Sequence, residues 1–271
     1  MKADKEHGWQ KSGPNRNGDR EEPYPDRPRR DPLQYLNYEL LDSCDPQAFQ
    51  ATKPYPYWNP QGVLTAEGFR RLVDTLPTTD VMQPFFNVQR KHGQDPHDRY
   101  TLEYDRHSKV SDDWKAFIAE LRGPRYGKWL RGMFGRQRLR LNFHWHYAPA
   151  GASVSPHCDS PRKLGSHIFY LNEAPDWDPS WGGETVVLDD GGRFSPKSAP
   201  KWEDFPPGIA AETLGNRSFL FARCGNSWHG VRAIRCPEGK LRKVFIVVVN
   251  DIALSMFHEA KVRITGRAAT Y

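Results

Sequence analysis

The stretch RLRLNFHWHYAPAGASVSPHCD, residues 138–159, decides the predicted fold. Apolar and polar side chains alternate from Arg138 to Tyr147, which is the two-residue period of a β-strand. Residues 148–151, Ala-Pro-Ala-Gly, then have the composition of a turn, and a second strand is predicted at residues 154–159. The stretch therefore predicts two strands joined by a turn, and it ends in the tripeptide His-Cys-Asp.

The pattern changes from helical before this stretch to extended after it. Three helices are predicted at residues 64–76, 111–122 and 126–134, with Thr65 and Ser111 as N-caps and Gly135 as the last helix's stop. A short strand is predicted near residues 100–104, and further strands at 167–171, 184–188, 218–222 and 243–250. Many short strands separated by turn residues are typical of a jelly roll. We therefore predict an α+β fold, in which N-terminal helices pack on a double-stranded β-helix (jelly-roll) core.

The chain of 271 residues is long enough for one domain with a substantial core. Residues 1–34 are rich in charge, Gly and Pro, and are predicted to be a polar extension. Residues 35–271 are predicted to be a single domain, with a helical lead-in at 35–136, the core at 137–252 and a tail at 253–271. The net charge of +6 comes without a long run of Lys and Arg, so a nucleic-acid partner is not expected.

The cysteine spacing and the lengths of the apolar runs indicate in which cellular compartment the protein is expected. Cys44, Cys158, Cys224 and Cys236 have no CxxC spacing, so they predict neither a zinc site nor a disulfide framework. The N-terminus has no apolar segment of the kind found in secretory signals, and the longest apolar run, residues 244–249, is far too short to span a membrane. We expect a cytoplasmic protein with no membrane partner.

His157 and Asp159 are the strongest candidate metal ligands. In a strand, residues i and i+2 point to the same face, so the two side chains can share one cation while Cys158 points away. His229, in the sequence Trp-His-Gly-Val, supplies a third ligand. Two histidines and one carboxylate form the facial triad that suits iron(II) and leaves positions open for cosubstrate and oxygen. His144 and His146 also have i, i+2 spacing, but packing within their strand explains them as well, and His167 is expected to be structural.

The order of these motifs resembles the iron(II)- and 2-oxoglutarate-dependent oxygenase superfamily, in particular its prolyl-hydroxylase-like branch. The matching positions, which lie within residues 55–251, are Tyr147, Gly151, His157, Asp159, Tyr170-Leu171-Asn172, Gly182-Gly183-Glu184, His229 and Arg242. The resemblance implies a dioxygenase, an oxidoreductase that uses Fe(II), 2-oxoglutarate and O2. Such an enzyme oxidises, and typically hydroxylates, a substrate C–H bond with release of succinate and CO2. Because Asp159 is present, halogenation is disfavoured.

The resemblance also implies a site for 2-oxoglutarate. The far carboxylate of this dianion needs a buried cation, and the family places one on the strand after the second histidine. Arg242 occupies that position, and a cation that opens an apolar strand is costly to bury without an anion. The parity of the strand groups Arg242 with Val244, whereas Lys243 points the other way and is the alternative. Tyr147 is a second candidate contact for 2-oxoglutarate, and Asn142 is a weaker one.

The substrate is expected to be a small molecule, such as an amino acid or a biosynthetic intermediate. Two alternatives stay open: a protein hydroxylase acting on prolyl or other side chains, and a jelly-roll binding module without catalysis. Loops at residues 80–107 and 189–210 are expected to shape specificity, because loops commonly do so on a β-scaffold. Arg162, Lys163 and Arg193 are expected near the mouth of the site, where they can hold a carboxylate or remain solvated.

Overall fold

A computed structural model describes residues 33–90, 93–174 and 176–256 of the chain. The predicted extension at residues 1–34 falls almost wholly outside the described residues, as does most of the predicted tail at 253–271.

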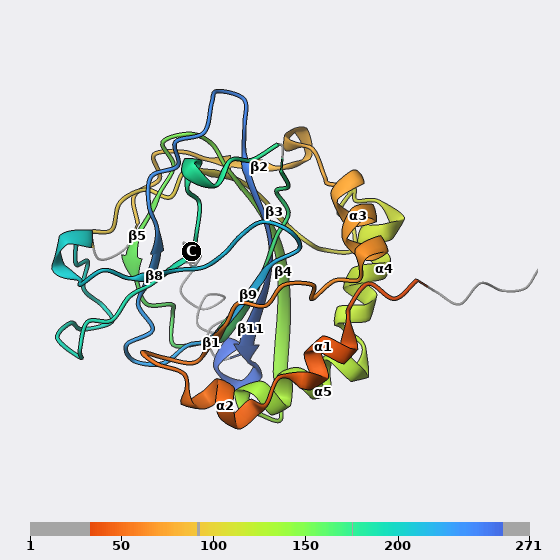
Figure 1. Cartoon of the computed structure of the whole chain (residues 1–271), viewed down its shortest axis with the longest axis horizontal. Helices are drawn as coiled ribbons and strands as arrows, with labels where there is room; N and C mark the ends of the chain where they lie inside the picture. The colour runs from red at the N-terminus through yellow and green to blue at the C-terminus, as the bar shows by residue number, and fades with distance from the viewer. Residues whose placement is uncertain (1–32, 91–92, 175, 257–271) are drawn as a thin grey trace, which may run out of the picture. The chain divides into compact units, whose positions relative to one another are not determined.

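Two antiparallel sheets form the centre of the domain (Figure 1). Within the described ranges, the large sheet has seven strands in the order β1-β9-β6-β11-β4-β3-β2, and the small sheet has four in the order β5-β10-β7-β8. The large sheet comprises β1 (Tyr57–Trp58), β2 (Gln83–Phe85), β3 (Arg99–Glu103), β4 (Leu139–Ala148), β6 (Lys163–Tyr170), β9 (Ser218–Ala222) and β11 (Arg242–Asp251). The small sheet comprises β5 (Val154–His157), β7 (Val186–Val187), β8 (Ile209–Ala210) and β10 (His229–Val231).

The chain passes back and forth between the two sheets from β4 onward. It runs from β4 to β5, returns to β6, crosses to β7 and β8, returns to β9, crosses to β10 and ends on β11. This winding is that of a double-stranded β-helix, so the predicted jelly roll is confirmed. The long strands β4 and β11 pair over their full length, from Arg242 opposite Ala148 to Asp251 opposite Leu139.

Five α-helices of the described residues come before β4 along the chain. They are α1 (Tyr38–Ser43), α2 (Pro46–Ala51), α3 (Ala66–Asp74), α4 (Asp112–Leu121) and α5 (Pro124–Phe134). The predicted caps are confirmed: Thr65 and Ser111 accept hydrogen bonds from Gly68 N and Trp114 N, and Gly135 ends α5 in the left-handed conformation with φ of 59°. Helices α1 and α2 were not predicted, because each has only six residues.

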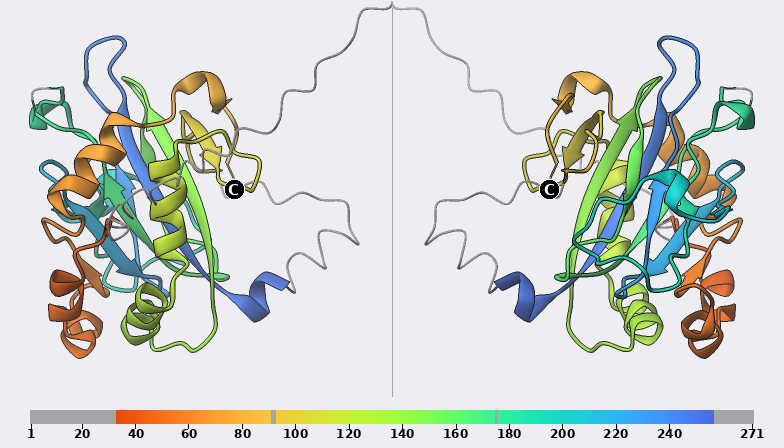
Figure 2. Two further views of the ribbon diagram at one scale, coloured as in Figure 1. Left: turned by 90° about the vertical axis from the view of Figure 1, so that its right-hand side faces the viewer. Right: turned by 90° about the vertical axis from the view of Figure 1, so that its left-hand side faces the viewer.

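The helices cover the outer face of the large sheet. Figures 1 and 2 show α3, α4 and α5 on one side of this sheet, opposite the side on which β5 and β8 lie. Aromatic side chains fill the interface: the rings of Trp114 and Trp145 have centroids 4.9 Å apart, and Trp114 lies equally close to Phe245. His167 belongs to this layer. Its Nδ1 faces the Tyr126 hydroxyl at 2.9 Å and its Nε2 faces Ser218 Oγ at 3.0 Å, so it is structural, as expected.

The inner face of the large sheet turns toward the small sheet. Residues of β11 alternate between the two faces, so that Phe245 packs under the helices whereas Val244 and Ile246 line a cavity. Within the part of the chain that the structure describes, none of the helices is long and apolar enough to cross a membrane.

Candidate metal centre

The three predicted metal ligands converge at the edge of the small sheet. His157 ends β5 and His229 begins β10, and the two residues are directly paired across the antiparallel strands. Asp159 lies two residues beyond His157, so the strand is shorter than the predicted 154–159. One ligand atom from each of the three residues lies within 4.8 Å of the others. Among the described residues, this is the only group of three or more His, Cys, Asp or Glu that converges in this way.

Hydrogen bonds to the backbone orient both imidazole rings. His157 Nδ1 lies 3.0 Å from the carbonyl oxygen of Ser155, and His229 Nδ1 lies 3.0 Å from that of Ser227. Because a carbonyl oxygen can only accept, each Nδ1 must carry the proton, which leaves the lone pair on Nε2. This is the arrangement by which outer partners fix the tautomer of metal-binding histidines.

The electrostatics of the site favour the protonation states that a metal needs. Burial lowers the pKa of both His157 and His229, so the two rings are neutral at pH 7. Burial alone would raise the pKa of Asp159, but the Lys163 ammonium, 3.0 Å from its Oδ1, and the two neighbouring histidines bring it below its usual range. Two neutral imidazoles and one carboxylate match the donor set of the iron(II) facial triad.

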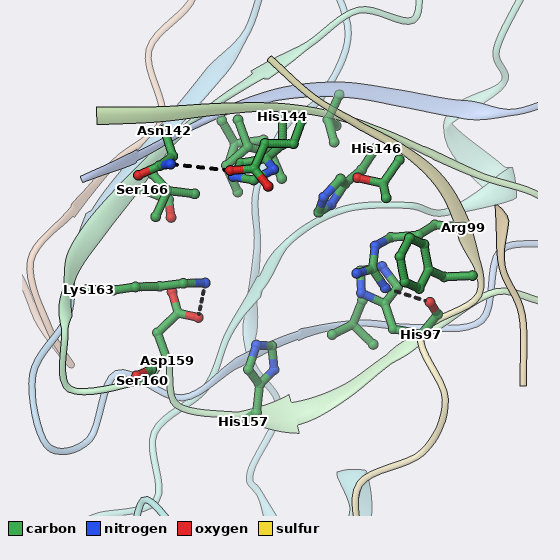
Figure 3. A pocket seen from close by; sticks show the side chains of 18 of the residues that line it. His97, Arg99, Asn142, His144, His146, His157, Asp159, Ser160, Lys163 and Ser166 are labelled. Atoms are coloured by element: carbon green, nitrogen blue, oxygen red, sulfur yellow. Dashed lines mark hydrogen bonds and ion pairs between the residues drawn. The ribbon is translucent and has the colours of Figure 1, made fainter. Parts of the chain in front are cut away.

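A cavity of about 1850 Å³ opens from the triad between the two sheets. Figure 3 shows His144, His146 and Arg99 on one side of this space, facing His157 and Asp159 on the other. The volume exceeds the roughly 300–1,000 Å³ of typical small-molecule pockets. Both loops expected to shape specificity contribute to the lining, through residues 80–107 and through Ser195, Pro196 and Lys197.

Arg242 lines the same cavity as the triad and is buried at the start of β11. Its Nε donates to the carbonyl oxygen of Gly183, and its guanidinium lies 5.6 Å from the centroid of the Tyr170 ring. Burial lowers the pKa of Arg242. Lys243 points the other way, with its Nζ 4.0 Å from Asp176, and is not part of the lining. The structure thus places Arg242, and not Lys243, on the cavity.

The Gly-Gly-Glu motif is explained by its contact with Arg242. Gly183 has φ of 96°, and a Cβ at this position would lie 2.9 Å from Arg242 Cδ. A side chain at this position would therefore have two effects: it would strain the backbone, and it would displace Arg242. Glu184 adds a negative charge that raises the pKa of Arg242 against the effect of burial.

Tyr147 does not lie at the site, which corrects one expectation. It is 2% exposed and belongs to the core under the helices, on the opposite face of β4 from His146. The reason is the two-residue period of the strand: His144 and His146 line the cavity, so Tyr147 must point away from it. Asn142 does line the cavity, where it donates to Glu103 Oε1 at 3.3 Å.

His144 and His146 face the cavity without forming a second metal group. Their ring centroids are 5.9 Å apart, and burial lowers the pKa of His144 to about 4 and that of His146 well below its usual value. Arg162 and Lys163 line the cavity as expected, whereas Arg193 is held by the carbonyl oxygens of Asp190 and Asp204.

The cavity residues that were not singled out in the sequence include Arg90, His97 and Arg99. They lie in the segment predicted to be irregular, and Arg99 begins β3. One feature of the sequence could have indicated this part of the cavity: charged and polar residues recur at every second position of β3, at Arg99, Thr101 and Glu103. All three line the cavity, and β3 pairs with β4.

Comparisons with known proteins agree with the fold. No protein-family model matches the chain, and no curated protein matches it. A prolyl hydroxylase from Trichoplax adhaerens, solved with a hypoxia-inducible-factor peptide, is 12% identical with a TM-score of 0.55, covering 81% of this chain and 92% of its own. A Pseudomonas putida prolyl-4-hydroxylase is 15% identical, with a TM-score of 0.48 and coverage of 72% and 91%. The non-heme α-ketoglutarate-dependent epimerase SnoN from nogalamycin biosynthesis is 16% identical, with a TM-score of 0.47 and coverage of 79% and 84%.

The chain therefore has the jelly-roll fold found in iron(II)- and 2-oxoglutarate-dependent oxygenases, and specifically in prolyl hydroxylases. At this level of identity the likeness concerns the fold alone, and the activity has to be argued from the chain's own residues.

Proposed function

We propose that this protein is an Fe(II)- and 2-oxoglutarate-dependent dioxygenase that oxidises a C–H bond of its substrate, releasing succinate and CO2. The observation that carries the proposal is the convergence of His157, Asp159 and His229 on a cavity that also contains a buried arginine, Arg242. A structural metal site would be closed by a fourth ligand, whereas this group has three ligands and faces an open cavity.

Each residue has a separate role in this proposal. His157, Asp159 and His229 hold iron(II), which supplies the oxygen-activating chemistry when 2-oxoglutarate is bound. Arg242 binds the far carboxylate of 2-oxoglutarate, because a buried guanidinium favours a carboxylate in bidentate geometry. Lys163 pairs with Asp159 Oδ1 and keeps this carboxylate ionised and oriented.

We propose hydroxylation of a small molecule, such as an amino acid or a biosynthetic intermediate, as the reaction. A protein hydroxylase is the second candidate, and one observation favours it: the cavity of about 1850 Å³ has room for a peptide segment as well as for a metabolite.

Succinate formation tests the proposal. The full chain is incubated in air with Fe(II), ascorbate and 2-oxoglutarate, alone and with either amino acids or proline-containing peptides. Succinate is quantified, and substrates are analysed for a mass gain of one oxygen. We expect succinate from the wild type and none from His157→Ala, while the control Arg70→Ala, at an exposed position on α3 outside the cavity lining, keeps the activity. Succinate formed equally by wild type and His157→Ala would contradict the proposal. The class of substrate that gains oxygen decides between the two candidates.

A further inference from the structure

Two arginines of the cavity, Arg90 and Arg99, have no assigned role. Arg90 lies between β2 and β3, Arg99 is the first residue of β3, and both line the cavity. Neither forms an ion pair with any residue that the structure describes. Two other lining cations are engaged: Lys163 pairs with Asp159 at 3.0 Å, and Arg223 Nε donates to the Asp159 carbonyl oxygen at 3.2 Å.

Both guanidiniums contain a buried N–H group that lacks an acceptor. Arg90 Nη1 and Arg99 Nε are buried with no hydrogen-bond partner among the described residues. The one hydrogen bond of the Arg99 side chain runs from Nη1 to the carbonyl oxygen of His97, at 2.8 Å, and its guanidinium lies 5.4 Å from the centroid of the Phe85 ring. Buried donors are almost always satisfied in native proteins, so two orphaned donors on one cavity indicate an acceptor that a ligand supplies.

Carboxylates lie near both charges without pairing with them: Asp159 and Asp95 raise the pKa of Arg90 and Asp98 raises that of Arg99, but none of them forms an ion pair with either arginine. Burial lowers the pKa of Arg90, and it lowers that of Arg99 to about 10. The neighbouring His97 and His146 rings, with centroids 6.0 Å apart, are neutral at pH 7 because burial lowers the pKa of both. Asp98, which follows His97, accepts a hydrogen bond from the backbone N–H of Asn87 at 2.7 Å.

Arg90 and Arg99 line the same cavity as the metal triad, and Figure 3 shows Arg99 and His157 in that space. A group bound at Arg90 and Arg99 therefore lies in the cavity that contains the reacting centre. Arg242 differs from Arg99, because its Nε has an acceptor, the carbonyl oxygen of Gly183.

We propose that Arg90 and Arg99 form a subsite for an anionic group of the substrate, a carboxylate or a phosphate. The inference rests on the proposed function, and it specifies the substrate: an acid, oxidised at a carbon near its anionic end. The shared chemistry is an oxyanion that accepts from the guanidinium N–H groups, as carboxylates and phosphates both do.

Calorimetric titration of small probes tests the subsite. The full chain is first saturated anaerobically with Fe(II) and 2-oxoglutarate, so that the Arg242 site is filled. The probes are N-acetylglycine, its uncharged analogue N-acetylglycinamide, and methyl phosphate, all at one ionic strength. The variants are Arg90→Gln and Arg99→Gln, with the exposed Arg70→Gln on α3 as the control.

We expect at least one anionic probe to bind the wild type about tenfold or more tighter than the amide, and each glutamine variant to lose about tenfold of that affinity. Arg70→Gln should bind as the wild type does. Comparison of N-acetylglycine with methyl phosphate separates a carboxylate from a phosphate. The melting temperature of the two variants without a probe should equal or exceed that of the wild type, because the buried donors are unsatisfied without a ligand.

The inference is overturned if neither anion binds the wild type more tightly than the amide, a result that needs no variant. Binding that is unchanged in both glutamine variants would overturn it equally. A wild type that fails to bind Fe(II) and 2-oxoglutarate would instead refute the proposed function, so the two failures are distinguishable.

Discussion

The two faces of β4 differ in almost every respect. Phe143, Trp145 and Tyr147 point toward the helices and are nearly inaccessible to solvent. Asn142, His144 and His146 alternate with them and line the cavity. The outer face is aromatic and closely packed, with the rings of Trp145 and Phe245 4.9 Å apart. The inner face is polar and borders open space.

Because successive side chains of β4 point to opposite faces, one strand contributes both to the packed core and to the lining of the cavity. Burial of large rings on the outer face stabilises the fold, so the inner face is free to hold polar groups that contribute little to stability. The same division applies to β11, where Phe245 packs under the helices and Arg242 lines the cavity. Substitutions on the two faces should therefore have separable effects.

The largest expected difference is between neighbouring residues of β4. Trp145→Ala should lower the free energy of unfolding by about 3–5 kcal/mol, because it removes a fully buried ring from contact with Trp114 and Phe245. His146→Ala should change it by less than about 1 kcal/mol. Urea denaturation followed by circular dichroism measures both. Equal losses of stability would show that the two faces are not divided in this way.

The next largest expected difference is in the affinity for 2-oxoglutarate, between variants of the adjacent β11 residues Arg242 and Lys243. Arg242→Ala should raise the concentration of 2-oxoglutarate needed for half-maximal binding by about 10–100-fold, because the carboxylate loses a charge-assisted hydrogen bond. Lys243→Ala should leave it unchanged, since Lys243 points away from the cavity. Calorimetric titration of the Fe(II)-loaded, oxygen-free protein reports the affinity. A stronger effect of Lys243→Ala would reassign the carboxylate site.

Gly183→Ala should reproduce part of the Arg242 effect without removing the arginine. The added Cβ meets Arg242 Cδ and forces a residue other than glycine to φ of 96°, at a cost of about 1–3 kcal/mol in stability. The affinity for 2-oxoglutarate should fall less than in Arg242→Ala. Gly191→Ala is the control, since it also has a positive φ but no atom within 4 Å of the added Cβ. If the two alanine variants behave alike, the contact with Arg242 is not the cause.

The last expected effect appears only at acid pH and concerns the outer face. Burial lowers the pKa of His167 to about 3, from an ordinary value near 6.5. Between these values the unfolded chain binds a proton that the folded chain does not. The stability is therefore fully present above pH 6.5, and it declines as the pH falls toward 3, by up to about 1.4 kcal/mol per pH unit.

Denaturation at a series of pH values, with His167→Gln, measures this slope. The variant should show a shallower decline than the wild type between pH 6 and 4. Tyr126→Phe removes the hydroxyl that faces His167, so it should lower stability but keep the slope. An unchanged slope in His167→Gln would assign the acid sensitivity to other groups.

The features that depend on local periodicity were predictable from the sequence. The alternation along residues 138–147 predicted β4, and Thr65, Ser111 and Gly135 marked helix ends that the structure confirms. The i, i+2 spacing of His157 and Asp159 predicted that these two candidate ligands lie together, and the structure groups them with His229. The parity of β11 separated Arg242 from Lys243.

What the sequence could not show depends on long-range packing. Tyr147 was assigned to the cosubstrate by its place in a motif, although the helices cover the face of β4 from which it projects. The position of Arg90 and Arg99 on the cavity could not be predicted, because it depends on the pairing of β3 with β4. The helices α1 and α2 are too short for periodicity to reveal them.

The central claim is that the inner face holds a centre for iron(II) and 2-oxoglutarate. Its most direct test is an anaerobic absorption spectrum of the metal-free protein after addition of Fe(II) and 2-oxoglutarate, compared with His157→Ala and Trp145→Ala. We predict that the weak visible charge-transfer band of the chelate appears in the wild type and is lost in His157→Ala. Trp145→Ala should keep the band wherever it remains folded. A wild type that shows no band and binds neither ligand would contradict the claim, and the protein would then be a jelly-roll binding module.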